Sequence, residues 1–137
     1  EMMTALPIDV LKAEFPADMS LVASETELLA ACRALDTVAR TPWVILSAGA
    51  EFDVFRRQVE LACRAGASGF LGGRAIWQEA VSMTDRIKRR RFFETTGHAR
   101  LQELIEITRR HGRPWYSRTG LPAADKAQTD AGWYLNY

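Results

Sequence analysis

The sequence has no long hydrophobic run, few cysteines and no excess of charge of one sign. No apolar stretch reaches the roughly 18 residues that a membrane-spanning helix needs, and the N-terminus lacks the basic region and apolar stretch of a secretory signal. The 18 basic and 17 acidic residues give a net charge of +1, so electrostatics gives no reason to expect nucleic acid or an anionic membrane as the main partner. We therefore predict a soluble protein that binds neither.

The two cysteines, Cys32 and Cys63, each lie in a segment with the apolar spacing of a helix. Neither has a second cysteine at the spacing of a metal site. Both are therefore predicted to be reduced residues of the core, which is typical of a cytosolic protein. We accordingly predict a cytoplasmic location, no metal and no cofactor.

The apolar segments alternate with helix-like segments. The 137 residues, 47% hydrophobic and 26% charged, are enough for one domain with a modest core. Continuous apolar runs predict strands at residues 8–15, 43–47 and 69–71, and apolar spacing predicts helices at 26–38, 53–65, from 76 onward and at 99–110. This alternation indicates the α/β class, with a parallel sheet covered on both faces.

The C-terminal part of the sequence has a different composition. Residues 113–137 mix proline, glycine and polar residues with five aromatic side chains, so we divide the chain into βα units at 1–116 and a tail at 117–137. The tail is expected to lie across the domain or a neighbouring subunit, and a flexible end is the alternative. The basic run at 88–91 is interpreted as a solvated helix end and is assigned no site.

The first predicted strand carries Lys12 and Glu14, at positions where a covered strand has apolar residues. Residues two apart in a strand point to the same face, so the two side chains are neighbours. A buried ammonium is destabilised unless it is paired or neutral, and a neutral amine is a nucleophile that forms Schiff bases with carbonyl substrates. A buried ion pair without chemistry explains the same spacing, and both interpretations stay open.

Small residues follow the other two predicted strands. Ser47, Ala48 and Gly49 end the second strand, and Gly73 and Arg74 follow the third. Small residues let backbone N–H groups approach an anion at a helix start, and a guanidinium binds phosphate through two hydrogen bonds. The loops after strands seven and eight of an eightfold barrel bind phosphate, so this order fits strands six to eight. Two ordinary strand-to-helix turns are the alternative.

Three segments together resemble the C-terminal part of class I tagatose bisphosphate aldolases and the related sulfofructose phosphate aldolases. They read DVLKAEFP at 9–16, PWVILSAG at 42–49 and AGASGFLGGRAIW at 65–77, in the order of the family. The segment HGRPWY at 111–116 is similar to the family's closing segment, so the resemblance covers residues 5–116.

The resemblance implies a partial (β/α)8 TIM barrel, approximately strands six to eight with their helices. It also implies a Schiff-base aldolase that cleaves a ketose (bis)phosphate to dihydroxyacetone phosphate and an aldehyde. Lys12 matches the family's imine-forming lysine. The positions that match its phosphate-binding residues are Ser47, Ala48, Gly49, Gly73 and Arg74. No catalytic role carries over to Glu14.

The sequence departs from the family in length, because the family's chains are about twice as long and strands one to five have no counterpart here. The family's proton-transferring lysine and acidic residue belong to those strands, and His98 and His111, predicted at the surface, do not replace them. We expect a fragment: a proteolytic product, a truncated form, half of a split enzyme paired with its N-terminal half, or a homologue that assembles with its own copies. The two hypotheses are the C-terminal half of an aldolase acting on a sugar phosphate and a non-catalytic remnant that binds phosphate or self-associates.

Overall fold

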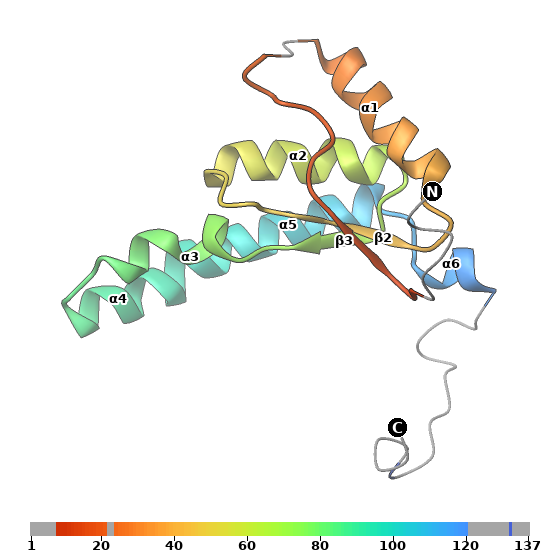
Figure 1. Cartoon of the computed structure of the whole chain (residues 1–137). Helices are drawn as coiled ribbons and strands as arrows, with labels where there is room; N and C mark the ends of the chain where they lie inside the picture. The colour runs from red at the N-terminus through yellow and green to blue at the C-terminus, as the bar shows by residue number, and fades with distance from the viewer. Residues whose placement is uncertain (1–7, 22–23, 121–131, 133–137) are drawn as a thin grey trace.

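The computed structural model describes residues 8–21, 24–120 and 132. Three strands, β1 (Leu11–Ala13), β2 (Trp43–Leu46) and β3 (Gly69–Leu71), form a parallel sheet in the order β1-β2-β3 (Figure 1). Helix α1 (Glu25–Val38) joins β1 to β2, and α2 (Phe52–Ala65) joins β2 to β3. The predicted α/β class with parallel strands is confirmed.

The helices after β3 form a longer run than the sequence predicts. They are α3 (Arg74–Val81), α4 (Arg86–Phe92), a π-helix (Phe93–Gly97), α5 (His98–His111) and α6 (Tyr116–Thr119). The predicted helix at 99–110 is therefore only the last part of a continuous helical stretch that begins at Arg86. Gly97 does not interrupt this stretch, because it is buried and the chain passes through it as one wide helical turn.

The sheet has one covered face and one open face. Trp43 and Ile45 point to the covered face, are fully buried and pack with Phe55 of α2 and Leu104 of α5. The other face carries Lys12 and the flanking apolar residues Val10 and Leu71, which are 50% and 48% exposed. The prediction of a sheet covered on both faces is thus wrong for the described residues, because the helices that pack on the sheet lie on the Trp43 side.

Strand β1 is also shorter than predicted, with three residues in place of the eight at 8–15. Among the described strands it lies at the edge of the sheet and pairs with β2 alone, which has four residues itself. Pairing therefore ends soon after Ala13, and Pro16, which has no backbone N–H, follows the strand.

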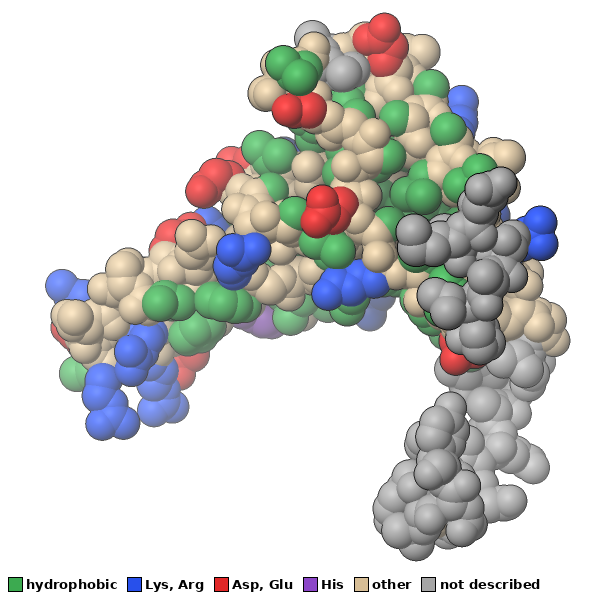
Figure 2. Space-filling view, viewed as in Figure 1, with side chains coloured by type: hydrophobic (Ala, Val, Ile, Leu, Met, Phe, Trp, Pro, Cys, Tyr) green, Lys and Arg blue, Asp and Glu red, His purple; other side chains and the backbone are tan. Residues whose placement is uncertain are grey.

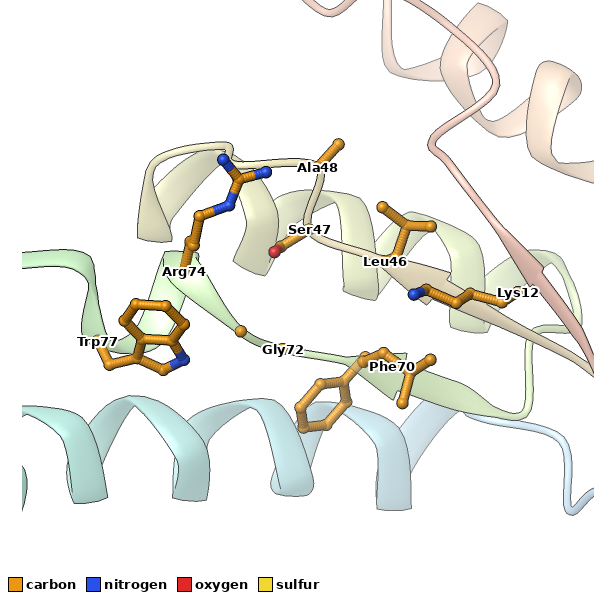
Figure 3. A pocket seen from close by; sticks show the side chains of 10 residues that line it. Lys12, Leu46, Ser47, Ala48, Phe70, Gly72, Arg74 and Trp77 are labelled. Atoms are coloured by element: carbon orange, nitrogen blue, oxygen red, sulfur yellow. The ribbon is translucent and has the colours of Figure 1, made fainter.

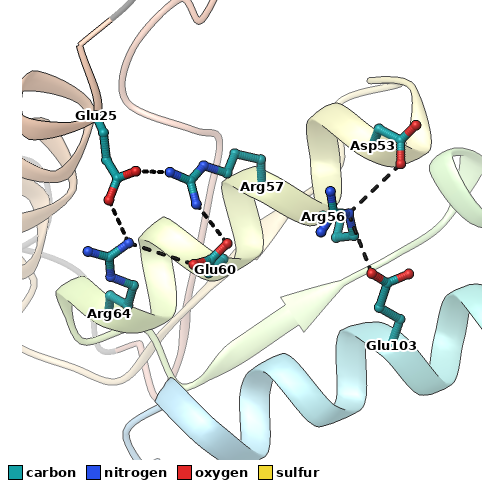
Figure 4. Close-up of polar contacts among 7 residues, drawn as sticks. All are labelled: Glu25, Asp53, Arg56, Arg57, Glu60, Arg64 and Glu103. Atoms are coloured by element: carbon teal, nitrogen blue, oxygen red, sulfur yellow. Dashed lines mark hydrogen bonds and ion pairs between the residues drawn. The ribbon is translucent and has the colours of Figure 1, made fainter.

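Ion pairs connect the helices on the covered side (Figure 4). Glu25 at the start of α1 accepts hydrogen bonds from Arg57 and Arg64 of α2, the latter at 2.8 Å. Arg56 of α2 pairs with Glu103 of α5 at 3.5 Å. These side chains are partly solvated, so each pair contributes little to stability and buried apolar packing dominates.

Asp36 of α1 is the main polar link between the core and the C-terminal segment. Its carboxylate accepts a hydrogen bond from Trp43 Nε1 at 2.8 Å and another from Arg118 of α6, and it forms an ion pair with Arg113 at 3.5 Å. Arg118 also donates to the backbone oxygen of Ala39 at 2.6 Å. Residues on both sides of position 116 are therefore attached to α1.

The division at residue 116 stays a prediction. Arg118 lies just beyond it and contacts the body of the molecule, in line with a tail that lies across the domain. Most of the tail, 121–131 and 133–137, lies outside the described residues.

Helix α4 projects from the body, and a cluster of basic side chains lies at this projecting end in Figure 2. None of its residues is buried, and Asp85 caps its start by accepting hydrogen bonds from the backbone N–H groups of Ile87 and Lys88. The basic run at 88–91 is solvated and most of it lies in the last turn of α4, as expected, although the chain continues from there into the π-helix. Over the described part of the chain, no helix is both long and apolar enough to cross a bilayer.

Cys32 and Cys63 are free and buried, as predicted. Burial raises the pKa of both thiols to about 11, so about a thousandth of each is the reactive thiolate at pH 8. We expect both cysteines to resist iodoacetamide at pH 8 in the folded protein and to react fully in denaturant, as measured by intact mass. Equal labelling rates in the two conditions would contradict this burial.

Candidate functional site

A pocket of about 610 Å³ lies at the carboxyl ends of the strands (Figure 3). Lys12 of β1, Ser47 and Ala48 after β2, and Gly73 and Arg74 after β3 all line it. The Lys12 and Arg74 side chains reach it from opposite ends. The structure thus brings together five of the six site residues predicted from the sequence, and their chemical roles stay predictions.

Lys12 is exposed, contrary to the expectation of a buried ammonium. It points to the open face of the sheet, and no hydrogen bond or ion pair joins it to another described residue. Glu14 is exposed as well and lines a neighbouring hollow. The alternative of a buried Lys12–Glu14 ion pair is therefore wrong, and the lysine is left available to a ligand.

The loop after β2 is a tight turn. The backbone N–H of Ala50 donates to the oxygen of Ser47 at 2.8 Å, and the two residues between them have positive φ, 47° at Ala48 and 86° at Gly49. Two consecutive positive φ angles are typical of a type I′ turn, which favours glycine. For Ala48 this backbone costs about 1 kcal/mol, a local strain of the kind that gathers at functional sites. Ser47, the first residue of the turn, is buried, with 6% of its surface exposed.

Arg74 connects this turn to the loop after β3. A Cβ atom at Gly49 would lie 3.2 Å from the guanidinium carbon of Arg74, so the guanidinium rests against the bare Cα of Gly49. Gly49 itself does not line the pocket. Arg74 is exposed and forms no hydrogen bond or ion pair with any described residue. Its donors are free for an anion in the pocket.

The sequence reasoning missed Trp77, which forms one wall of the pocket and is 37% exposed. A signal was present, because Trp77 follows Arg74 by three residues and helix positions three apart share a face. His98 and His111 are exposed and do not line the pocket, as predicted.

A pocket at the carboxyl ends of parallel strands is where α/β enzymes bind their ligands. The class defined by the fold and site is therefore an α/β protein with a ligand pocket at its strand ends.

Comparison with protein families places the chain more narrowly. The model of the DeoC/LacD family of aldolases matches residues 1–79, more than half of the chain. The protein belongs to the DeoC/LacD aldolase family.

Curated relatives agree with this assignment. The chain is 29% identical to tagatose 1,6-diphosphate aldolase 2 of Streptococcus mutans, over 83% of this chain and 39% of that protein. It is 32% identical to tagatose 1,6-diphosphate aldolase of Lactococcus lactis, over 79% of this chain and 37% of the relative. The chain thus spans about two fifths of the length of the curated relatives it matches.

Proposed function

We propose that this chain supplies the imine-forming and phosphate-binding part of a class I aldolase. The reaction is cleavage of a ketose (bis)phosphate to dihydroxyacetone phosphate and an aldehyde. The observation that carries the proposal is that Lys12 and Arg74, two cationic side chains on separate elements, line one pocket and have no partner among the described residues. Relatives named tagatose 1,6-diphosphate aldolases support it.

In the proposed mechanism the unprotonated amine of Lys12 attacks the ketone carbon of the substrate. Loss of water gives an imine, and its protonated form accepts the electron pair released when the bond between the third and fourth carbons breaks. The products are an aldehyde and an enamine of the three-carbon ketone phosphate, which hydrolysis frees from Lys12. Phosphate held by Arg74 and the backbone N–H groups of Ala48 and Gly73 would place the ketone carbon over Lys12.

The proposal includes the architecture around the pocket. We propose that β1, β2 and β3 are strands six to eight of a (β/α)8 barrel and that their open face turns to its interior. The exposure of Val10 and Leu71 on this face supports the idea, as does the length of the relatives. An N-terminal half, or further copies of this chain, would cover the face and supply the acid and base for proton transfer. A cytoplasmic location likewise stays a prediction.

The decisive experiment is borohydride trapping with dihydroxyacetone phosphate, followed by intact-protein mass spectrometry and peptide mapping. Borohydride reduces an imine to a stable secondary amine, so a live site gives an adduct on the peptide that contains Lys12. An adduct there supports the proposal. Absence of an adduct, with the protein folded and any companion chain present, would overturn it.

Phosphate binding is tested separately with Arg74. Arg74→Met removes the guanidinium and is expected to weaken inorganic phosphate binding about 10- to 100-fold, the range for losing hydrogen bonds to a charged group. Arg74→Lys keeps the charge but not the two-pronged geometry, so its affinity for phosphate should lie between those of Arg74→Met and the original protein. The matched control is Arg90→Met, because Arg90 is an exposed arginine of α4 whose ion-pair partner in the described part of the chain is Glu94. Isothermal titration would measure all four proteins, and equal affinities would exclude Arg74 from the site.

A further inference from the structure

Arg100 of α5 does not line the pocket, yet its guanidinium holds helix α3, which begins with Arg74. It donates to both carboxylate oxygens of Glu79, at 2.8 and 2.6 Å, and to the backbone oxygen of Ile76 at 3.2 Å. The side chain is only 19% exposed. Two-pronged pairs of this kind fix geometry as well as charge, and the hydrogen bond from Arg100 lowers the pKa of Glu79, which keeps the pair ionised near neutral pH.

The same guanidinium also contacts helix α2, which follows the turn at 47–50. Its carbon lies 4.9 Å from the ring centre of Phe52, the first residue of α2, and 5.7 Å from that of Phe92. Cation–π contacts at these distances are attractive. Hydrogen bonding to Glu79, together with the charges of Asp53 and Glu51 near the start of α2, raises the pKa of Arg100. One side chain therefore contacts the first turns of both helices.

The starts of α2 and α3 do not fill the space between them. A hollow of about 270 Å³ lies there, and Phe52, Arg74 and Glu79 are among the residues that line it. The starts of α2 and α3 are therefore not closely packed on each other here, and some other contact must set the distance between them. Arg100 connects two residues that line this space, because it contacts Phe52 of α2 and donates to Glu79 of α3.

The π-helix explains how Arg100 and Phe92 come to lie on the same face of one helical stretch. Two turns of α-helix take about seven residues, whereas Phe92 and Arg100 are eight positions apart. The wide turn at Phe93–Gly97 absorbs one additional residue, so the two side chains face the same side. Phe92 then covers the guanidinium and limits its contact with water.

We propose that Arg100 is a positioning residue that sets the spacing of the two pocket loops, 47–50 after β2 and 72–74 after β3. Holding Phe52 and Glu79 at a fixed separation keeps the Arg74 guanidinium against Gly49. The coupling of the loops stands on these contacts alone. Its consequence, a pocket preformed for a phosphate group, rests on the proposed function.

The test measures loop protection and phosphate affinity in the same variants. Arg100→Met removes the contacts of Arg100 with Phe52 and with Glu79. Hydrogen exchange is therefore expected to accelerate at least fivefold in peptides covering 47–52 and 72–77 but not in the centre of α2. Arg100→Lys keeps the charge and one hydrogen bond and should restore part of the protection. Glu79→Gln weakens only the α3 link, so it should affect 72–77 and leave 47–52 unchanged. Arg109→Met, which removes an exposed ion pair with Glu106 on the same helix, is the control.

The outcomes separate the two proposals. The positioning role would be overturned if hydrogen exchange in Arg100→Met accelerated in one loop only or in neither loop. It would also be overturned if exchange accelerated equally in all peptides. Inorganic phosphate should bind about tenfold more weakly to Arg100→Met than to the original protein, with partial recovery in Arg100→Lys. If the original protein binds no phosphate, the proposed function fails, whereas the exchange data still decide whether Arg100 couples the loops.

Discussion

Replacing Lys12 by alanine is expected to abolish the borohydride-trapped adduct with dihydroxyacetone phosphate. Imine formation needs a primary amine within reach of the carbonyl, and no other side chain can substitute for it. The sequence contains three lysines, at positions 12, 88 and 126. Lys12 lines the pocket, Lys88 is exposed on the projecting helix α4, and Lys126 lies outside the described residues. The adduct, measured by intact mass, should fall below detection.

Two further variants make this result specific. Lys88→Ala removes an amine of ordinary surface character and should leave the adduct unchanged. Lys12→Arg keeps a cation in the pocket but cannot form the imine, so it should lose the adduct while still binding inorganic phosphate. Trapping that persists in Lys12→Ala would remove Lys12 from its proposed role and direct attention to another amine.

Replacing Gly66 by alanine is expected to destabilise the protein by about 3 kcal/mol. Gly66 ends α2 with φ of 120°, which L side chains rarely adopt, and a Cβ atom there would lie 2.5 Å from Asp36 Oδ1. Asp36 cannot move away freely, because it accepts hydrogen bonds from Trp43 and Arg118. The substitution therefore adds backbone strain and also disrupts a half-buried polar network. A urea titration followed by circular dichroism measures the change.

Gly120→Ala is the matched control for this prediction. Gly120 ends α6 with a left-handed φ of 69°, but no heavy atom of the described residues lies within 4 Å of a Cβ atom built there. Its replacement tests backbone strain alone and should shift stability by about 1 kcal/mol. Equal losses in the two variants would show that the contact with Asp36 contributes nothing.

Much of the fold could be predicted because its signals are local. Continuous apolar runs marked β2 and β3, and apolar spacing placed α1 and α2 within one residue of their observed limits. The predicted limit at residue 65 agrees with the Gly66 that follows it, since a left-handed residue after a helix favours glycine. Ser47 follows β2 and Arg74 follows β3 in the sequence. The carboxyl ends of parallel strands share one edge of the sheet, so both residues could be predicted to line one pocket.

Other features depend on contacts that no local pattern contains. The exposure of Lys12 follows from the open face of the sheet, which continuous apolar strands do not predict. The sequence placed only the last part of the long helical stretch, because the π-helix and the burial of Gly97 within it depend on packing. The contact of Arg100 with Phe52 joins residues that are far apart in the sequence, and its geometry depends on how α2, α3 and α5 pack. Sequence spacing alone cannot predict such a contact.

The parallel sheet also has a consequence for the order of folding. Leu11 pairs with Trp43 and Val44 pairs with Gly69, so every strand contact closes a long loop that contains a whole helix. Arg118 reaches back over 82 residues to Asp36. Loop closure must precede the gain from such contacts, whereas helices form from neighbours along the chain. The helices are therefore expected to form first, and the strand register and the Arg118 contact to be the late, rate-limiting events.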